Sequence, residues 1–404
     1  MIKYVTLAAG AMACTLSYST ATLAESTDVA TAIEPIATEA TQETVSLETS
    51  TGTEEVVVDR SNKFRPIILP FYDPSIKAGI SAIPLFAFYP DDNDLVSDAS
   101  TIAIPLIYTS NDSYVAKVAG DIILNEDRFR ISFEGGFTST NLNFNGTEGN
   151  KQQFDFDADF MFKVAEDMFV GIGGIYESSR YTADHSDEQQ NMVNMGFNTD
   201  YQSDVGYRLS FQWDTREQFY YPHGGFMWQV NYEDHAKWLG NDEDSTYSSL
   251  FSDYRYFYSL NDDPHHIIAT KLVGRYLFDA DNAPSSAFTT YGRQGKEVQR
   301  GYAQGDYISS NMLNLEVEYR HQFQDSEYDF VNKSAVVLIG GVGKSFGEKL
   351  EGYEEGFRDS DWLGVIGVGY RYTILPYERL NIKVDVTQNS DGETIAYFGF
   401  GESI

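Results

Sequence analysis

Apolar and polar residues alternate with a period of two from about residue 64 onward, and this alternation constrains the fold more than any other feature. In the stretch FDFDADFMFKV, residues 154–164, the phenylalanines share one parity and the aspartates the other. Successive side chains of a strand point to opposite faces, so this segment has one aromatic face and one charged face. Segments such as LNIKVDVT, residues 380–387, repeat the pattern, and no amphipathic helix of ordinary length is found.

Two architectures accommodate such strands: a soluble sandwich, which buries the apolar face, and a transmembrane barrel, which turns that face to lipid. The barrel is favoured because many strands are long and aromatic residues recur near their ends. The charges of Glu316, Glu318 and Arg320 on the polar face suit a lumen. We therefore predict an all-β fold, a transmembrane antiparallel β-barrel of about 16 strands, with the phenylalanines of 154–164 toward lipid. The predicted strands are 76–89, 99–109, 113–124, 127–138, 152–164, 168–178, 203–215, 225–234, 246–259, 265–278, 285–293, 309–323, 333–345, 361–373, 378–388 and 393–402.

The N-terminal region predicts export. Lys3 precedes an apolar core, and a run of small residues ends at Ala24, so residues 1–24 have the features of a signal peptide that contains the only cysteine, Cys14. Residues 25–63 are acidic and lack aromatic residues, which predicts a disordered linker before a barrel over 64–404. Export predicts a location in the cell outer membrane, and the formal net charge of −33 excludes nucleic acid as a partner.

Three stretches, in order, resemble the bacterial surface antigen (D15) barrel family, the membrane domain of a superfamily for outer-membrane assembly and translocation that includes BamA and TamA. The sequence FQWDTREQFYYPHGG resembles its strand-turn signature, VQRGYAQGD the tip of its sixth extracellular loop, and residues from GVIGVGYRYTILPYERL onward its last three strands. The signature residues are Asp214, Arg216, Pro222 and Gly224.

The resemblance implies that the sixth loop folds back into the lumen, where Arg300 contacts acidic groups of the barrel wall. Glu316, inward on the following strand, matches one acidic partner. Ile339 stands about where the family often has a second one, an aspartate. The predicted loop lock consists of Gln299, Arg300, Gly301, Tyr302 and Glu316.

The resemblance also implies a weak lateral seam between the first and last strands. We expect it between residues 76–89 and 393–402, with Gly399 and Gly401 weakening the last strand. Family members carry POTRA modules before the barrel, and the 39 residues of 25–63 are shorter than one such module, so a barrel-only member is expected.

The motifs that resemble enzyme or metal sites are each incomplete. GKSFG, around Ser345, matches a nucleophile elbow, but no helix pattern and no histidine follow it. His265 and His266 lack a spaced set of further ligands, and the aspartates of 155–159 lack the glycine and closing glutamate of a calcium loop. No catalytic, cofactor-binding or metal site is therefore predicted.

Two hypotheses for function remain. The first is a non-enzymatic membrane machine whose seam helps proteins or lipid to insert into or cross the outer membrane. Its partners would be outer-membrane lipid and unfolded outer-membrane proteins or a translocated substrate; the oligomeric state is open. The alternative is a passive pore or a structural surface antigen without insertase activity. A narrow, plugged lumen favours the first, and a wide, conducting lumen favours the second.

Overall fold

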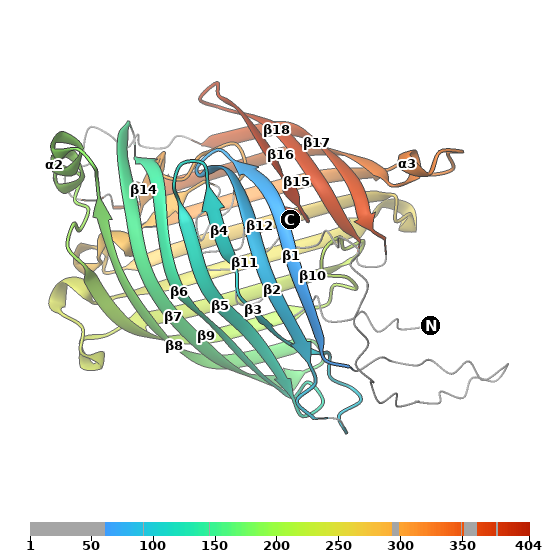
Figure 1. Cartoon of the computed structure of the whole chain (residues 1–404), viewed down its shortest axis with the longest axis horizontal. Helices are drawn as coiled ribbons and strands as arrows, with labels where there is room; N and C mark the ends of the chain where they lie inside the picture. The colour runs from blue at the N-terminus through green and yellow to red at the C-terminus, as the bar shows by residue number, and fades with distance from the viewer. Residues whose placement is uncertain are drawn as a thin grey trace.

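The computed structural model describes residues 61–91, 93–144, 146–292, 299–348, 350, 362–376 and 379–404. Over this part of the chain, sixteen antiparallel strands close into one barrel (Figure 1). Residues 1–60, which include the predicted signal peptide and most of the predicted linker, lie outside the described residues. The strands of the wall are β1 (Lys63–Asp73), β2 (Lys77–Phe88), β3 (Ser100–Ala103) with β4 (Leu106–Thr109), β5 (Tyr114–Leu124), β6 (Phe129–Phe144), β7 (Thr147–Ala165), β8 (Met168–Thr182), β9 (Gln202–Asp214), β10 (Gly225–His235), β11 (Tyr247–Ser259), β12 (His266–Phe278), β15 (Asn311–Gln322), β16 (Ser334–Phe346), β17 (Leu363–Leu375), β18 (Leu380–Asn389) and β19 (Thr394–Phe400).

Each wall strand pairs with its neighbours in the sequence, and β19 pairs with β1 to close the barrel. β3 and β4 cross the wall together as one strand, interrupted before Leu106 because Pro105 has no N–H to donate to the ladder. Hydrogen bonds from Ile104 N to Pro84 O (3.0 Å) and from Lys117 N to Pro105 O (3.1 Å) hold this interruption in the wall. The predicted all-β barrel and its strand number are confirmed.

One wall strand was not predicted and one predicted strand is not part of the wall, so the two errors cancel in the count. The first wall strand is β1, so residues 76–89 correspond to the second strand. Residues 285–293 do not form part of the wall: they contain the turn η6 (Ser285–Ala287) and β13 (Thr289–Tyr291). β13 pairs only with β14 (Tyr307–Ser309), in a separate two-stranded sheet.

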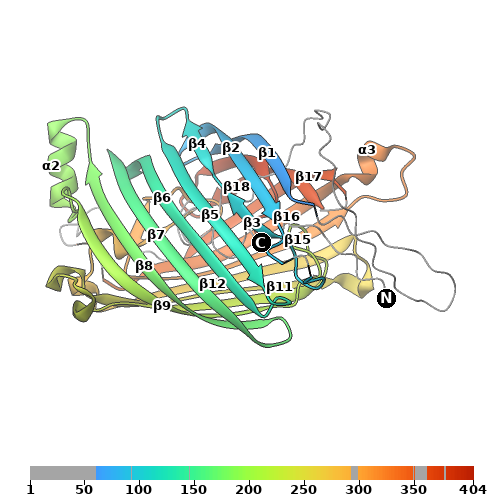
Figure 2. The same cartoon turned by 60° about the horizontal axis from the view of Figure 1, so that its bottom comes forward.

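The two faces of β7 lie as the alternation predicts. Phe154, Phe156 and Phe160 are 44–48% exposed on the outer face, whereas Asp155 and Asp159 are only 8% exposed inside. Figure 2 shows β7 in the middle of the tilted wall formed by β5 to β9. The outer face is thus an aromatic surface suited to lipid, and the inner face is polar.

The inward aspartates of β7 are paired with cations from other strands. Lys117 Nζ on β5 lies 2.8 Å from Asp155 Oδ2, and Arg208 Nη1 on β9 lies 2.6 Å from Asp159 Oδ2. Because neither side of these pairs is well solvated, the pairing removes the large cost of an isolated buried charge.

Short helices mark the two ends of the barrel. α2 (Ser186–Asn194) follows β8 at one end, and α3 (Asp329–Asn332) precedes β16 at the other (Figure 1). Among the described residues, no helix has the length and apolar character needed to cross a membrane. Because the strands alternate in direction, β1 begins and β19 ends at the α3 end.

The seam between β1 and β19 is the weakest pairing in the wall. A single Cα pair, Tyr72 with Phe398, registers β1 on β19, whereas all 11 residues of β1 register on β2. In the same register Pro70 faces Phe400, where β19 ends. In the part of the chain that the structure describes, no strand therefore lies beside residues 64–69 on the seam side.

Prolines of β1 deprive this edge of donors. Pro66 lies opposite Pro84 in the β1–β2 ladder, and two prolines cannot exchange N–H bonds. In an antiparallel ladder, bonded and non-bonded pairs alternate, so the nitrogens of Pro66 and Pro70 face the seam. The edge of β1 thus lacks two of the donors that would bind a neighbouring strand.

Candidate functional site

The connection between β12 and β15, residues 279–310, enters the lumen. Its described residues include Arg300, Tyr291 and Tyr302, each 0% exposed. The two tyrosine rings meet edge to face with centroids 5.7 Å apart, and they pack in a cluster with inward residues of the wall such as Val273. A polar segment of this length is buried because the wall satisfies its charges and hydrogen bonds.

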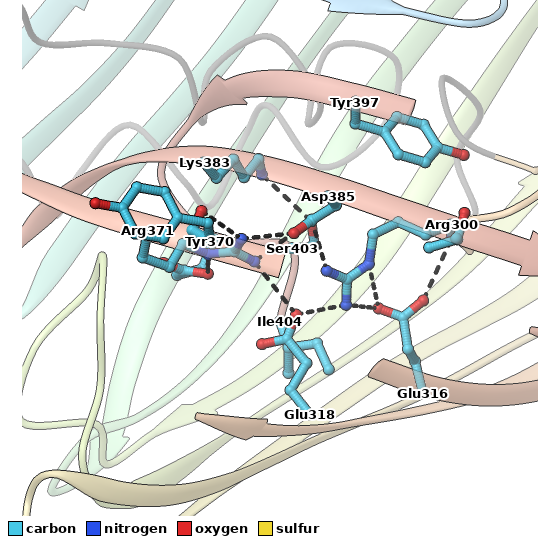
Figure 3. A network of polar contacts seen from close by, with 12 residues as sticks. Arg300, Glu316, Glu318, Tyr370, Arg371, Lys383, Asp385, Tyr397, Ser403 and Ile404 are labelled. Atoms are coloured by element: carbon cyan, nitrogen blue, oxygen red, sulfur yellow. Dashed lines mark hydrogen bonds and ion pairs between the residues drawn. The ribbon is translucent and has the colours of Figure 1, made fainter. Parts of the chain in front are cut away.

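Arg300 is held first by Glu316 of β15. Arg300 Nε donates to Glu316 Oε1 at 2.9 Å and the main-chain N of Arg300 donates to Glu316 Oε2 at 3.2 Å; Nη2 also contacts Oε1. Two guanidinium nitrogens therefore share Oε1 and the main-chain N binds Oε2, so that both oxygens of the carboxylate are held by Arg300. Figure 3 shows Arg300 pointing between the two strands that carry its partners.

Two further carboxylates complete the contacts of Arg300. Its Nη1 lies 2.8 Å from Asp385 Oδ2 on β18, and its Nη2 contacts Glu318 on β15. These carboxylates are bound in turn by arginines of the wall: Arg371 Nη1 lies 2.5 Å from Asp385 Oδ1, and Arg320 Nε lies 2.7 Å from Glu318 Oε2.

These side chains form one charge-balanced group, which we call the lumen ion cluster. Its acidic members each contact at least one of its arginines, and its charges are four positive and four negative. Balance matters because every member is almost inaccessible to water. The members are Arg300, Arg320, Arg371, Lys383, Glu316, Glu318, Asp385 and Glu402.

The neighbours of Arg300 tie the connection to the last three strands. Gly301 N donates to Tyr397 Oη of β19 at 2.8 Å, and Asn389 Nδ2 of β18 donates to Gly301 O at 2.8 Å. Gly301 has φ +95°, and an added Cβ would lie 2.5 Å from Val365 Cγ2 of β17, so a side chain there is excluded. Tyr302 Oη donates to the main-chain oxygen of Gly364 at 2.9 Å.

Gln299 makes a weaker contact with the same strand, since its Nε2 donates to Leu363 O at 3.4 Å. The structure thus places all five residues of the predicted loop lock in one buried region. Ile339 of β16 is also buried, and the further acidic contacts of Arg300 come from Asp385 and Glu318.

Comparisons of sequence identify no relative: no family model and no curated protein matches the chain. Comparisons of structure find solved proteins with a similar fold. BamA from Haemophilus ducreyi lacking POTRA domains 1–3 aligns with TM-score 0.62 and 12% identity, covering 90% of this chain and 74% of that one. CdiB from Acinetobacter baumannii (TM-score 0.53, 11% identity) covers 89% and 64%, and CdiB from Escherichia coli (0.55, 8%) covers 89% and 67%. The chain has the barrel fold of BamA and CdiB.

In this BamA-like barrel, the strand-turn signature lies in the connection between β9 and β10 at the α3 end, and Tyr221 of the same connection contacts Arg320 of the ion cluster. Asp214 accepts bonds from Arg216 Nε (2.9 Å) and Nη2 (2.7 Å), which brace the start of the turn. Gly224 N donates to Glu217 Oε2 at 3.1 Å, and Pro222 is buried beside it. These residues shape the turn that returns the chain into β10.

The seam prediction needs correction in two respects. The partner of β19 is β1, Lys63–Asp73, and not residues 76–89. Gly399 does lie in β19, opposite Lys383, but Gly401 lies beyond the end of the strand and has φ +71°. Gly401 therefore acts as a turn that redirects the chain, a conformation that glycine adopts without strain.

After Gly401 the chain enters the lumen, a feature that the sequence analysis missed. Glu402 Oε2 lies 2.7 Å from Arg371 Nε, and its Oε1 accepts a bond from Asn381 at 2.9 Å. Lys383 Nζ donates to Ser403 Oγ at 3.3 Å. We call residues 402–404 the tail; each is at most 4% exposed, and Figure 3 shows two of them among the ion cluster.

Proposed function

We propose that this chain is a non-enzymatic outer-membrane barrel that assists the insertion or translocation of proteins or lipid through the seam between β1 and β19. Its proposed partners are outer-membrane lipid and either unfolded outer-membrane proteins or a translocated substrate. The fold shared with BamA and CdiB and the apolar outer face support the membrane location.

The observation that carries the proposal is the edge of β1 that no described strand covers. Among the described residues, no strand lies on the seam side of residues 64–69, and within them Phe64 and Ile68 are 56% and 62% exposed. A strand edge with free main-chain groups can bind an incoming strand by extending the sheet. The single registered pair between Tyr72 and Phe398 makes the rest of the seam inexpensive to open.

The buried connection argues against the alternative of a wide passive pore. Arg300 and Tyr302 are buried in the lumen against β15, β17 and β18, and the tail lies near the α3 end. A lumen filled in this way favours passage beside the wall over passage through its centre.

The test is the folding of a denatured barrel client into liposomes with and without this protein, using a seam that can be locked. Tyr72→Cys with Phe398→Cys places two thiols at the registered pair, where opposite Cα atoms lie about 4.5–5.5 Å apart and a disulfide is allowed. The matched control, Ile68→Cys with Ala82→Cys, links β1 to β2 in the same way.

We expect acceleration of client folding by the unmodified protein, loss of that acceleration when the seam pair is oxidised, and recovery on reduction. The β1–β2 pair should leave the acceleration intact. A folded protein that gives no acceleration, or equal acceleration with the seam locked, contradicts the proposal. Steady conductance across a planar bilayer would then favour a pore.

A further inference from the structure

A cavity of about 290 Å³ lies at the α3 end of the barrel, and its lining residues Tyr221 and Asn381 contact Arg320 and Glu402 of the lumen ion cluster. It is bounded by connections that follow β9, β11, β15 and β17, so its wall is assembled from four separate turns of the chain. This volume is at the small end of ligand pockets in proteins, which suits a small ion or one end of a larger molecule. The lining residues are Tyr221, His223, Pro264, His265, Gln322, Asn332, Lys333, Thr373, Pro376, Arg379 and Asn381.

The charge of this lining is opposite to that of the protein. The chain has 61 acidic and 28 basic residues, yet no described residue that lines the cavity is acidic. The lining contributes Arg379, Lys333 and two histidines. The cavity beside β12, by contrast, is lined by Asp279, Asp281 and Glu348.

The carboxylates that pair with these basic groups stand outside the lining. Arg379 Nη1 lies 2.9 Å from Glu217 Oε1, and Lys333 Nζ lies 2.7 Å from Asp329 Oδ2. Neither Glu217 nor Asp329 lines the cavity. The contacts of Arg379 with described residues are made through Nη1, so the other edge of the guanidinium has capacity for an anion.

A main-chain contact holds Arg379 in place, and burial sets the charge of His223. Arg379 Nη1 also donates to the main-chain oxygen of Tyr221 at 3.2 Å, which anchors the guanidinium against the floor of the cavity. Burial and then the charge of Arg379 lower the pKa of His223 to about 4, so His223 is neutral at physiological pH. A neutral imidazole can donate one hydrogen bond without adding to the repulsion between the cations.

We propose that this cavity binds a phosphate group, either as the free ion or at the end of a larger molecule, through Arg379 and Lys333. A guanidinium offers two parallel donors that match two oxygens of a phosphate, and an ammonium from a facing turn provides a second charge. The tetrahedral group presents oxygens in several directions and therefore suits donors that come from separate connections. This site is independent of the seam and of the proposed insertase role.

The test measures binding of inorganic phosphate to the full-length purified protein in phosphate-free detergent by isothermal titration calorimetry. Glycerol phosphate serves as a second probe and acetate as a third. We expect saturable binding of phosphate at one site, with Arg379→Gln and Lys333→Gln each raising the dissociation constant about tenfold or more. Lys237→Gln, which removes a lysine paired with Glu243 beyond the end of β10, should have no effect.

Arg379→Lys tests whether Arg379 binds phosphate or only supports the connection between β17 and β18. It keeps the positive charge but removes the paired donors of the guanidinium. The Arg379→Lys variant should therefore bind phosphate more tightly than Arg379→Gln. Tighter binding of glycerol phosphate than of phosphate would identify the end of a larger molecule as the ligand, and equal binding would identify the free ion. The absence of saturable binding, equal affinity for acetate, or full affinity in the double variant Arg379→Gln/Lys333→Gln would overturn the proposal.

Discussion

Replacing Arg300 with alanine is the sharpest test of how the lumen is held together. Arg300 is the only described cation within ion-pair distance of Glu316, and it also contacts Glu318 and Asp385. All of these groups are at most 2% exposed, so the change leaves a buried carboxylate with no counter-charge. Removing one partner of a buried pair typically costs about 3–5 kcal/mol, and Arg300→Ala should lower the free energy of unfolding by that amount.

Adding Glu316→Gln to Arg300→Ala separates the cost of an unpaired buried charge from the cost of the lost arginine side chain. In Arg300→Ala the ion cluster keeps four acidic and three basic members, and Glu316→Gln restores the balance. Because Glu316 pairs only with Arg300 among the described cations, the double variant should recover about 1–3 kcal/mol relative to Arg300→Ala. Lys237→Gln, at an exposed pair, should change stability by less than about 1 kcal/mol.

The assay is unfolding by guanidinium chloride in lipid vesicles, followed by tryptophan fluorescence, with heat-dependent mobility on electrophoresis as a check on folding. A loss below about 1 kcal/mol in Arg300→Ala would show that water or a rearranged connection replaces the guanidinium, which refutes the argument from burial. An additive double variant, with no recovery, would show that the cost of Arg300→Ala comes from lost packing and not from an unpaired charge.

Three other predictions test separate parts of the molecule. Phe156→Arg places a charge on the outer face and should destabilise the barrel in vesicles by about 2–4 kcal/mol, whereas Phe156→Leu should cost much less; equal effects would contradict a lipid-facing surface. Gly401→Val forces a β-branched residue into φ +71° and should cost about 1–3 kcal/mol by the same unfolding assay, and no loss would show that the turn is not required. Asp214→Asn weakens the half-buried pair with Arg216 and should cost about 1 kcal/mol, clearly less than Arg300→Ala; a larger loss would assign this turn a greater role than its contacts indicate.

The fold could be predicted because its signal is repeated in every strand. Along β7 the polarity of nearly every residue indicates whether it faces lipid or the lumen, so a few irregular positions do not obscure the alternation. β1 escaped prediction because Pro66 and Pro70 interrupt its sequence and are poor strand formers, although both are allowed at an edge. The prediction of a wall strand at residues 285–293 was wrong because a short apolar segment has the same composition whether it packs inside a barrel or in its wall.

The site could be predicted only in part. Glu316 lies on the strand that directly follows the connection, so its approach to Arg300 follows from local chain direction. Asp385 lies 85 positions from Arg300, and nothing in the sequence of β18 distinguishes it from other inward polar residues such as Asn381. Which inward residues meet depends on strand tilt and register around the closed barrel, and a single sequence does not contain that information.

The tail links the ion cluster to the weakness of the seam. If β19 continued in its present register, residue 402 would lie opposite Ile68, which is 62% exposed on the outer face. Opposite residues of an antiparallel pair share a face, so the carboxylate of Glu402 would then meet lipid. In the lumen the same carboxylate finds Arg371 and Asn381. The charge of Glu402 therefore favours the inward turn at Gly401. Because the chain turns inward there, β19 does not extend along residues 64–69 of β1.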